Sequence, residues 1–107
     1  MKTVFLTDID GTLVRRDVPL PDTVVAAAHD YTARGGLLAV CTGRSVVAAR
    51  EIAQRLGVNL PCILYGGASL YDFQTERHVS LHPFRWNILD GVARVLECHP
   101  QISMQVF

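Results

Sequence analysis

The chain has 107 residues, of which 50% are apolar and 19% are charged, and its formal net charge at pH 7 is zero. This composition is typical of one small globular domain and excludes a disordered or collagen-like chain. The balanced charge, with no basic cluster, predicts no binding to nucleic acid or to an anionic membrane. The opening apolar run is too short for a signal-peptide core or a membrane span, so we expect a cytoplasmic protein.

Strands and helices alternate through the first part of the chain. Residues 4–7 are an apolar run that ends in acids, so we expect a strand that is buried on both faces. Ser45 is a good N-cap for the second helix. The predicted order is strand, helix, strand, helix, strand, at residues 4–7, 21–34, 37–41, 46–56 and 62–65. Such alternation implies crossover connections and an α/β three-layer sandwich around a parallel sheet.

The pattern changes after Tyr65. Turn residues between two short apolar runs predict a hairpin, and Pro83 fits the first turn of a third helix. Weak alternation at the end of the chain predicts a last strand. These elements are two hairpin strands, a helix to about Cys98 and a strand, at residues 68–72, 77–82, 83–98 and 102–107.

Polar side chains follow the first two predicted strands. Asp8 and Asp10 come directly after the first strand, and Thr42 and Gly43 come directly after the second. In a parallel α/β sheet, ligands bind beyond the carboxyl ends of the strands. We therefore expect these four residues to lie on one crevice.

The acidic pair has chemistry of its own. Two carboxylates two residues apart repel each other and raise each other's pKa, unless a cation neutralises them. Mg²⁺ takes oxygen ligands and often bridges carboxylates to phosphate, and a carboxylate can itself form an aspartyl-phosphate. Gly11 lets the backbone turn sharply, and the helix that opens near Ser45 offers N–H groups to an anion. The alternative is that the acidic pair belongs to a capped surface turn with no function, but the Thr-Gly turn after the next strand favours a binding site.

These motifs resemble a known family. Residues 8–13 (DIDGTL) look like motif one of the haloacid-dehalogenase-like (HAD) hydrolases, and residues 42–44 (TGR) look like their motif two. The form of motif two, and the hairpin at residues 65–72, are similar to the Cof-type phosphatases, which carry a large α/β cap. The resemblance implies a Rossmann-like core at residues 1–82, incomplete, and the beginning of the cap domain at residues 83–107.

The resemblance also implies roles for single residues. Asp8 would be the nucleophile and a Mg²⁺ ligand. Asp10 would be the general acid/base and would give its backbone carbonyl to the metal. The residues implied in binding the substrate phosphate are Ile9, Gly11, Thr42, Gly43 and Arg44. For Arg44 a salt bridge at the helix start is an equal alternative.

Two departures from the family pattern bear on activity. Gly66 stands where an Asn is usual in the hairpin. The lysine of motif three and the acidic cluster of motif four are absent, and Lys2 is the one lysine in the chain. Losing one preorganised stabilising group can cost about 3–4 kcal/mol of barrier. We therefore expect a truncated phosphatase with impaired activity.

The resulting prediction is a Mg²⁺-dependent phosphatase that hydrolyses a small phosphorylated metabolite through an aspartyl-phosphate. The alternative is a non-catalytic remnant, a binding or scaffold module that keeps the first half of the fold. The first strand is expected to lie at an open edge of the sheet, and such edges invite pairing with a second copy of the chain.

Overall fold

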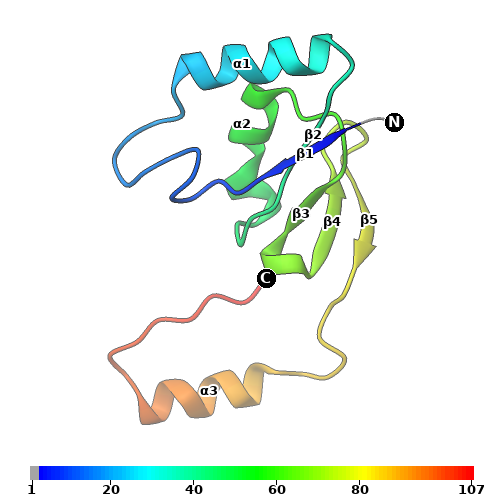
Figure 1. Ribbon diagram of the computed structural model, residues 1–107. Helices are drawn as coiled ribbons and strands as arrows, with labels where there is room; N and C mark the ends of the chain where they lie inside the picture. The colour runs from blue at the N-terminus through cyan, green and yellow to red at the C-terminus, as the bar shows by residue number, and fades with distance from the viewer. Residues whose placement is uncertain (1–2) are drawn as a thin grey trace.

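The computed structural model describes residues 3–107, and the strands and helices of the first part alternate as predicted (Figure 1). The five elements are β1 (Val4–Thr7), α1 (Asp22–Ala33), β2 (Leu37–Val40), α2 (Val46–Leu56) and β3 (Cys62–Leu64). Each lies within one or two residues of its predicted range. The Ser45 hydroxyl accepts a hydrogen bond from the Ala48 N–H at 3.3 Å, which confirms the predicted N-cap of α2.

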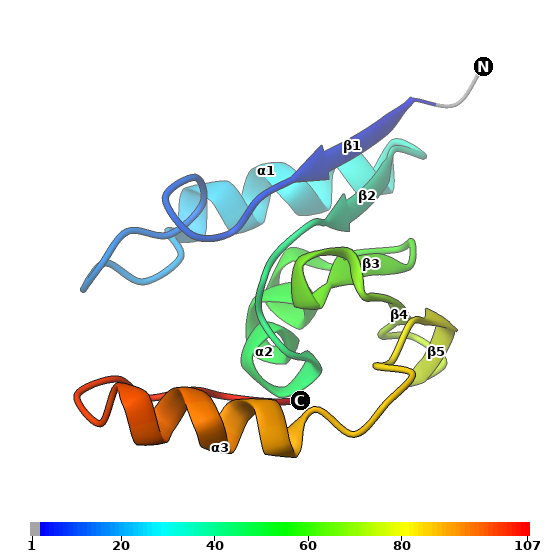
Figure 2. The same cartoon turned by 90° about the horizontal axis from the view of Figure 1, so that it is seen from below.

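β2 lies between the other two parallel strands (Figure 2). β1 pairs with β2 in parallel, with Val4 opposite Leu37. β3 joins on the other side through a parallel bridge between Cys41 and Ile63. Within the described residues, β1 therefore forms one edge of the sheet, as predicted.

The prediction that β1 is buried on both faces is wrong. Its residues Val4, Phe5 and Leu6 are between 50% and 54% exposed. β1 has a neighbouring strand on one side only among residues 3–107, so its apolar side chains keep about half of their surface in contact with water.

The two helices pack against each other. The Arg55 guanidinium on α2 donates to the Asp22 carboxylate on α1 at 3.0 Å, and the His29 ring nitrogen lies 2.8 Å from the Arg55 carbonyl. Because they touch, α1 and α2 cover the same face of the sheet, and the described residues supply two layers of the predicted α/β sandwich. The α/β class and the incomplete parallel sheet are confirmed. The side chains that α2 buries recur at helical spacing and are Val46, Ala49, Ala53 and Leu56.

The predicted hairpin is present and extends the sheet beyond β3. A short 3₁₀ turn, η1 (Tyr65–Gly67), leads into β4 (Ser69–Asp72), which pairs antiparallel with both β3 and β5 (Arg77–Leu81). The parallel and antiparallel parts thus share β3.

The last part of the chain differs from the prediction. α3 (Leu89–Cys98) begins six residues later than Pro83, where the Asn87 side chain accepts a hydrogen bond from the Leu89 N–H at 3.0 Å. That side chain satisfies one of the free N–H groups of a helix start, which Pro83 cannot do. No residue of α3 is buried.

The predicted strand at residues 102–107 is also wrong. A strand needs a neighbour for its backbone groups, and no described strand pairs with this segment. The segment instead turns back toward η1 (Figure 1), where the rings of Tyr65 and Phe107 lie 5.6 Å apart. None of the helices in residues 3–107 has the length and hydropathy to cross a bilayer.

Candidate functional site

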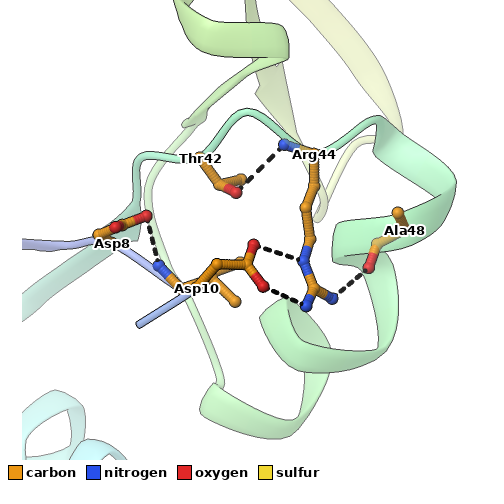
Figure 3. Close-up of polar contacts among 6 residues, drawn as sticks. Asp8, Asp10, Thr42, Arg44 and Ala48 are labelled. Carbon is orange, nitrogen blue, oxygen red and sulfur yellow. Dashed lines mark hydrogen bonds and ion pairs between the residues drawn. The ribbon is translucent and has the colours of Figure 1, made fainter. Parts of the chain in front are cut away.

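The loops that follow β1 and β2 meet beyond the carboxyl ends of these strands. The two strands are parallel neighbours, and the Cys41 N–H donates to the Thr7 carbonyl at 2.8 Å just before the loops begin. Arg44, in the second loop, hydrogen-bonds the carboxylate of Asp10, in the first (Figure 3). The structure thus brings together the two segments that carry the predicted site residues.

Ile9 anchors the acidic loop. Its side chain is fully buried, and its carbonyl accepts hydrogen bonds from the N–H groups of Leu13 and Val14 at 2.9 and 3.0 Å. Gly11 has a φ of +79°, in the left-handed region that glycine tolerates best, and this allows the tight turn. With Ile9 pointing into the core, the side chains of Asp8 and Asp10 are left exposed.

The two aspartates have different partners. One carboxylate oxygen of Asp8 accepts a hydrogen bond from the Ile9 N–H at 2.7 Å. Residues 3–107 offer that carboxylate no other hydrogen bond. Asp8 therefore keeps one oxygen available to a ligand.

The carboxylate of Asp10 is held by Arg44 at both oxygens. The Arg44 Nε and Nη2 donate to them at 2.9 and 2.7 Å, which is the two-pronged geometry of a strong arginine–carboxylate pair. The hydrogen bonds from Arg44 lower the pKa of Asp10 below its ordinary value of 3.8, against the opposing effect of burial. The Asp10 hydrogen bonds raise the pKa of Arg44 in turn.

The sequence predicts a raised pKa for the acidic pair unless a cation neutralises it. Arg44 is that cation for Asp10, so the pKa of Asp10 is lowered instead. Of the two readings of Arg44 drawn from the sequence, the structure shows the salt bridge.

Thr42 and Gly43 form the turn between β2 and α2. Thr42 is buried, and its hydroxyl accepts a hydrogen bond from the Arg44 N–H at 3.1 Å. Gly43 is exposed, and a Cβ atom placed there would meet no atom within 4 Å other than those of its two neighbours in the chain. The open space at Gly43 leaves room for a ligand next to the turn.

Support for this turn comes from Tyr65 and Gly66, whose role the sequence did not reveal. The Gly66 N–H donates to the Thr42 carbonyl at 3.1 Å, and the Tyr65 hydroxyl accepts from the Val46 N–H at the start of α2 at 3.3 Å. Gly66 has a φ of +63° and a ψ of 25°, a conformation that Asn also tolerates. Glycine thus keeps the backbone geometry that the usual Asn could adopt, without its side-chain amide.

A hollow opens beside Arg44, between the loop after Val14 and α2. Its volume is about 330 Å³. Among the side chains that line it are Val14, Arg15, Leu20, Arg44 and Glu51. A group attached to an anion at the two loops could extend into this space.

The residues fit Mg²⁺ in part. Carboxylate oxygens are the ligands that Mg²⁺ prefers, and Asp8 offers one that is exposed. The Asp10 carboxylate is engaged by Arg44, which leaves its backbone carbonyl as the donor that this residue could give. Residues 3–107 contain no group of three or more acidic, His or Cys side chains that could hold a metal ion.

Comparison with known proteins identifies relatives of the chain. The sequence profile of the haloacid dehalogenase-like hydrolases matches residues 5–106. Pyridoxal phosphate phosphatase YbhA of Escherichia coli is 33% identical over 81 residues, which make up 75% of this chain and 29% of that protein. The Mycoplasma genitalium protein MG265 is 32% identical over 90 residues, which make up 83% of this chain and 32% of that protein. The chain spans between a quarter and a third of the length of the curated relatives it matches.

Solved structures share the fold. A haloacid dehalogenase-like hydrolase from Bacteroides thetaiotaomicron superposes with a TM-score of 0.81 at 13% identity, over 92% of this chain and 38% of that one. A protein from Geobacillus kaustophilus gives a TM-score of 0.76 at 19% identity, over 94% of this chain and 38% of that one. The motifs, the fold and the profile agree: the chain belongs to the haloacid dehalogenase-like hydrolases, in the Cof-type branch.

Proposed function

We propose that the chain carries the nucleophile side of a Mg²⁺-dependent phosphatase site, which hydrolyses a small phosphorylated metabolite through an aspartyl-phosphate. The observation that carries this proposal is the placement of Asp8 and Asp10, exposed on one loop, against the Thr42 turn of the neighbouring parallel strand. The similarity to the pyridoxal phosphate phosphatase of Escherichia coli supports a small phosphorylated substrate.

Asp8 is the nucleophile in this proposal. The Asp8 oxygen that the Ile9 N–H leaves free attacks the phosphorus atom, and the oxygen held by the Ile9 N–H keeps a second lone pair that could bind the metal. An oxygen–phosphorus bond forms to Asp8 while the bond to the leaving oxygen breaks. Water then attacks the same phosphorus, releases phosphate and restores the carboxylate, as in other enzymes with a carboxylate nucleophile.

Asp10 is the general acid/base. It gives a proton to the leaving oxygen in the first step and takes one from the attacking water in the second, so the proton count balances over the cycle. Because Arg44 holds both oxygens of Asp10 and lowers its pKa, Asp10 is a carboxylate in the free chain. Its role as the acid therefore requires one of the two hydrogen bonds to open and Asp10 to take up a proton from solvent when substrate binds.

The phosphate oxygens would bind between the two loops. The proposed contacts are the Thr42 hydroxyl, the N–H groups of Gly43 and of the acidic loop at Ile9 and Gly11, and the guanidinium of Arg44. Mg²⁺, held by the Asp8 carboxylate and the Asp10 carbonyl, would supply the charge neutralisation on which phosphoryl transfer depends. The hollow beside Arg44 would receive the leaving group.

A second reading is a non-catalytic binding or scaffold module. It is favoured by the partial fit to Mg²⁺, because residues 3–107 contain no group of three or more acidic, His or Cys side chains that could hold the ion. We also propose that the chain is located in the cytoplasm and that two copies of it pair through β1.

Hydrolysis of p-nitrophenyl phosphate separates the two readings. The phosphatase reading predicts turnover that requires Mg²⁺ and that disappears in Asp8→Asn, which keeps the shape of the side chain but removes the nucleophile. Asp30→Asn, on the exposed surface of α1, is the matched control and should keep the activity. Turnover that is equal in the unmodified chain and in Asp8→Asn would refute the proposal.

A further inference from the structure

Arg44 links the two loops of the site and α2. All three of its side-chain nitrogens have partners: Nε and Nη2 donate to the Asp10 carboxylate, and Nη1 donates to the Ala48 carbonyl in the first turn of α2 at 3.2 Å (Figure 3). Its side chain is 30% exposed, against 58% for Asp10. The guanidinium is thus fixed on the side of α2, and the Asp10 carboxylate is fixed to it.

This arrangement separates two like charges. Figure 3 shows the Asp10 carboxylate turned toward Arg44, whereas the Asp8 carboxylate lies back against the Ile9 N–H. In residues 3–107, Arg44 is the one cationic side chain that forms an ion pair with either aspartate. The other ion pairs of these residues are Arg34–Asp30, Arg50–Glu76 and Arg55–Asp22, all away from the acidic loop.

We propose that Arg44 is a positioning residue that assigns different tasks to the two aspartates. It holds Asp10 toward α2 and offsets its charge, and it leaves Asp8 as the carboxylate that meets a divalent cation. This inference rests on the proposed function, because it concerns which carboxylate the metal meets. It also implies that Arg44 weakens the binding of a divalent cation to the free chain, since its positive charge lies next to the same loop.

The implied effect on Mg²⁺ affinity is measurable by isothermal titration calorimetry. Arg44→Met removes the positive charge and the hold on Asp10, so we expect Mg²⁺ to bind about three- to tenfold more tightly, as screened interactions between charges several ångströms apart allow. Arg44→Lys keeps the charge but not the two-pronged hold on Asp10, so its affinity should lie between those of the unmodified chain and Arg44→Met. Arg34→Met is the matched control, because it removes the same charge from an exposed ion pair on α1, and it should leave the affinity unchanged.

A merely structural role for Arg44 gives a different result. It would lower the stability of Arg44→Met equally with and without Mg²⁺, and the affinity would stay the same. Equal affinities in the unmodified chain and Arg44→Met, or Mg²⁺ binding by neither, would overturn the proposal. So would an Arg44→Lys chain that binds Mg²⁺ as tightly as Arg44→Met.

A second measurement needs no variant of Arg44. Carbon-13 NMR of the aspartate carboxyl groups in the unmodified chain, assigned with Asp8→Asn and Asp10→Asn, should show that Mg²⁺ shifts the Asp8 signal. The Asp10 signal and the Arg44 Nε–H signal should stay in place. Movement of both Asp10 and Arg44 on addition of Mg²⁺ would overturn the proposal.

These outcomes are independent of turnover. If the chain shows the expected affinities and NMR shifts but hydrolyses no p-nitrophenyl phosphate, the positioning role of Arg44 is supported and the proposed phosphatase function is refuted. If the chain hydrolyses the ester and all variants bind Mg²⁺ with equal affinity, the proposed function is supported and the positioning role is refuted.

Discussion

At the scale of single residues, Ile9 determines how the two aspartates are presented. Its side chain is fully buried, while its neighbours on both sides, Asp8 and Asp10, are exposed. The same backbone then turns at Gly11, so the carbonyl of Ile9 can accept hydrogen bonds from the following residues. A loop built in this way presents two carboxylates without burying either.

The ion pair between Asp10 and Arg44 predicts a pH-dependent contribution to stability. The pKa of Asp10 is lowered in the folded chain, so the pair stabilises the fold above the ordinary pKa of 3.8 and loses this effect as the pH falls through the folded value. Because the pair is exposed, we expect Asp10→Asn to reduce the free energy of unfolding at neutral pH by only about 0.2–1 kcal/mol.

Urea unfolding of the unmodified chain and Asp10→Asn measures this effect. The difference should shrink as the pH falls through the lowered pKa of Asp10 in the folded chain, because both forms of residue 10 are then neutral. In an Arg44→Met background, Asp10→Asn should have no such pH dependence, because the partner is absent. A stability difference that grows as the pH falls would contradict the assignment.

The acidic pair and the Thr-Gly turn could be located from the sequence because both follow strands of clear apolar pattern. The side chain that pairs with Asp10 could not be predicted from the sequence. Arg44 is 34 residues away in the sequence, and whether its guanidinium meets a carboxylate or a ligand depends on side-chain geometry. The contacts by which Tyr65 and Gly66 hold the Thr42 turn could not be predicted for the same reason, because they are hydrogen bonds between separate loops.

At the scale of elements, α2 connects the site to the core. The Ala48 carbonyl in its first turn accepts a hydrogen bond from the Arg44 side chain. The side chains that the helix buries are Val46, Ala49, Ala53 and Leu56. Alanine at two of these positions lets the helix lie close to the sheet. The position of Arg44 therefore depends on how well α2 packs.

Leu56 provides a test of that packing. Its side chain is 2% exposed, and Leu56→Ala should lower the free energy of unfolding by about 2–3 kcal/mol through lost burial and the cavity that remains. Val47 is 84% exposed on the same helix, and Val47→Ala should change stability by less than about 0.5 kcal/mol. Chemical unfolding of both variants checks the comparison, and equal losses would show that α2 is not packed as described.

The predicted and observed elements differ where the local pattern was ambiguous. The periodicity of α3 could be recognised, but its start was misplaced because Pro83 and Asn87 are both plausible starts and only the hydrogen bond of Asn87 decides between them. Residues 102–107 alternate like a strand, yet a strand exists only with a partner, which a local pattern cannot supply.

At the scale of the whole molecule, β1 presents an unpaired edge. Its apolar residues are about half exposed, and an apolar hollow of about 420 Å³ lies between this strand and α1. Unpaired backbone groups next to exposed apolar side chains favour pairing with another strand. The proposed partner is the β1 edge of a second copy.

Light scattering coupled to size-exclusion chromatography tests this pairing. The unmodified chain should shift from monomer to dimer as its concentration rises, and Leu6→Lys should prevent the shift by placing a charge on the edge. Val47→Lys, on an exposed helical site, should behave as the unmodified chain does. A chain that stays monomeric at high micromolar concentration would exclude the dimer.

The most direct test of the central claim is to trap the phosphoryl group on the chain. The chain is incubated with p-nitrophenyl phosphate and Mg²⁺, quenched with borohydride, which reduces an acyl phosphate to an alcohol, and mapped by tandem mass spectrometry. The account predicts that Asp8 is converted to homoserine, that Asp10 is unchanged, and that Asp8→Asn gives no product. Reduction at another residue, or none at Asp8, would contradict the assignment of Asp8 as the nucleophile.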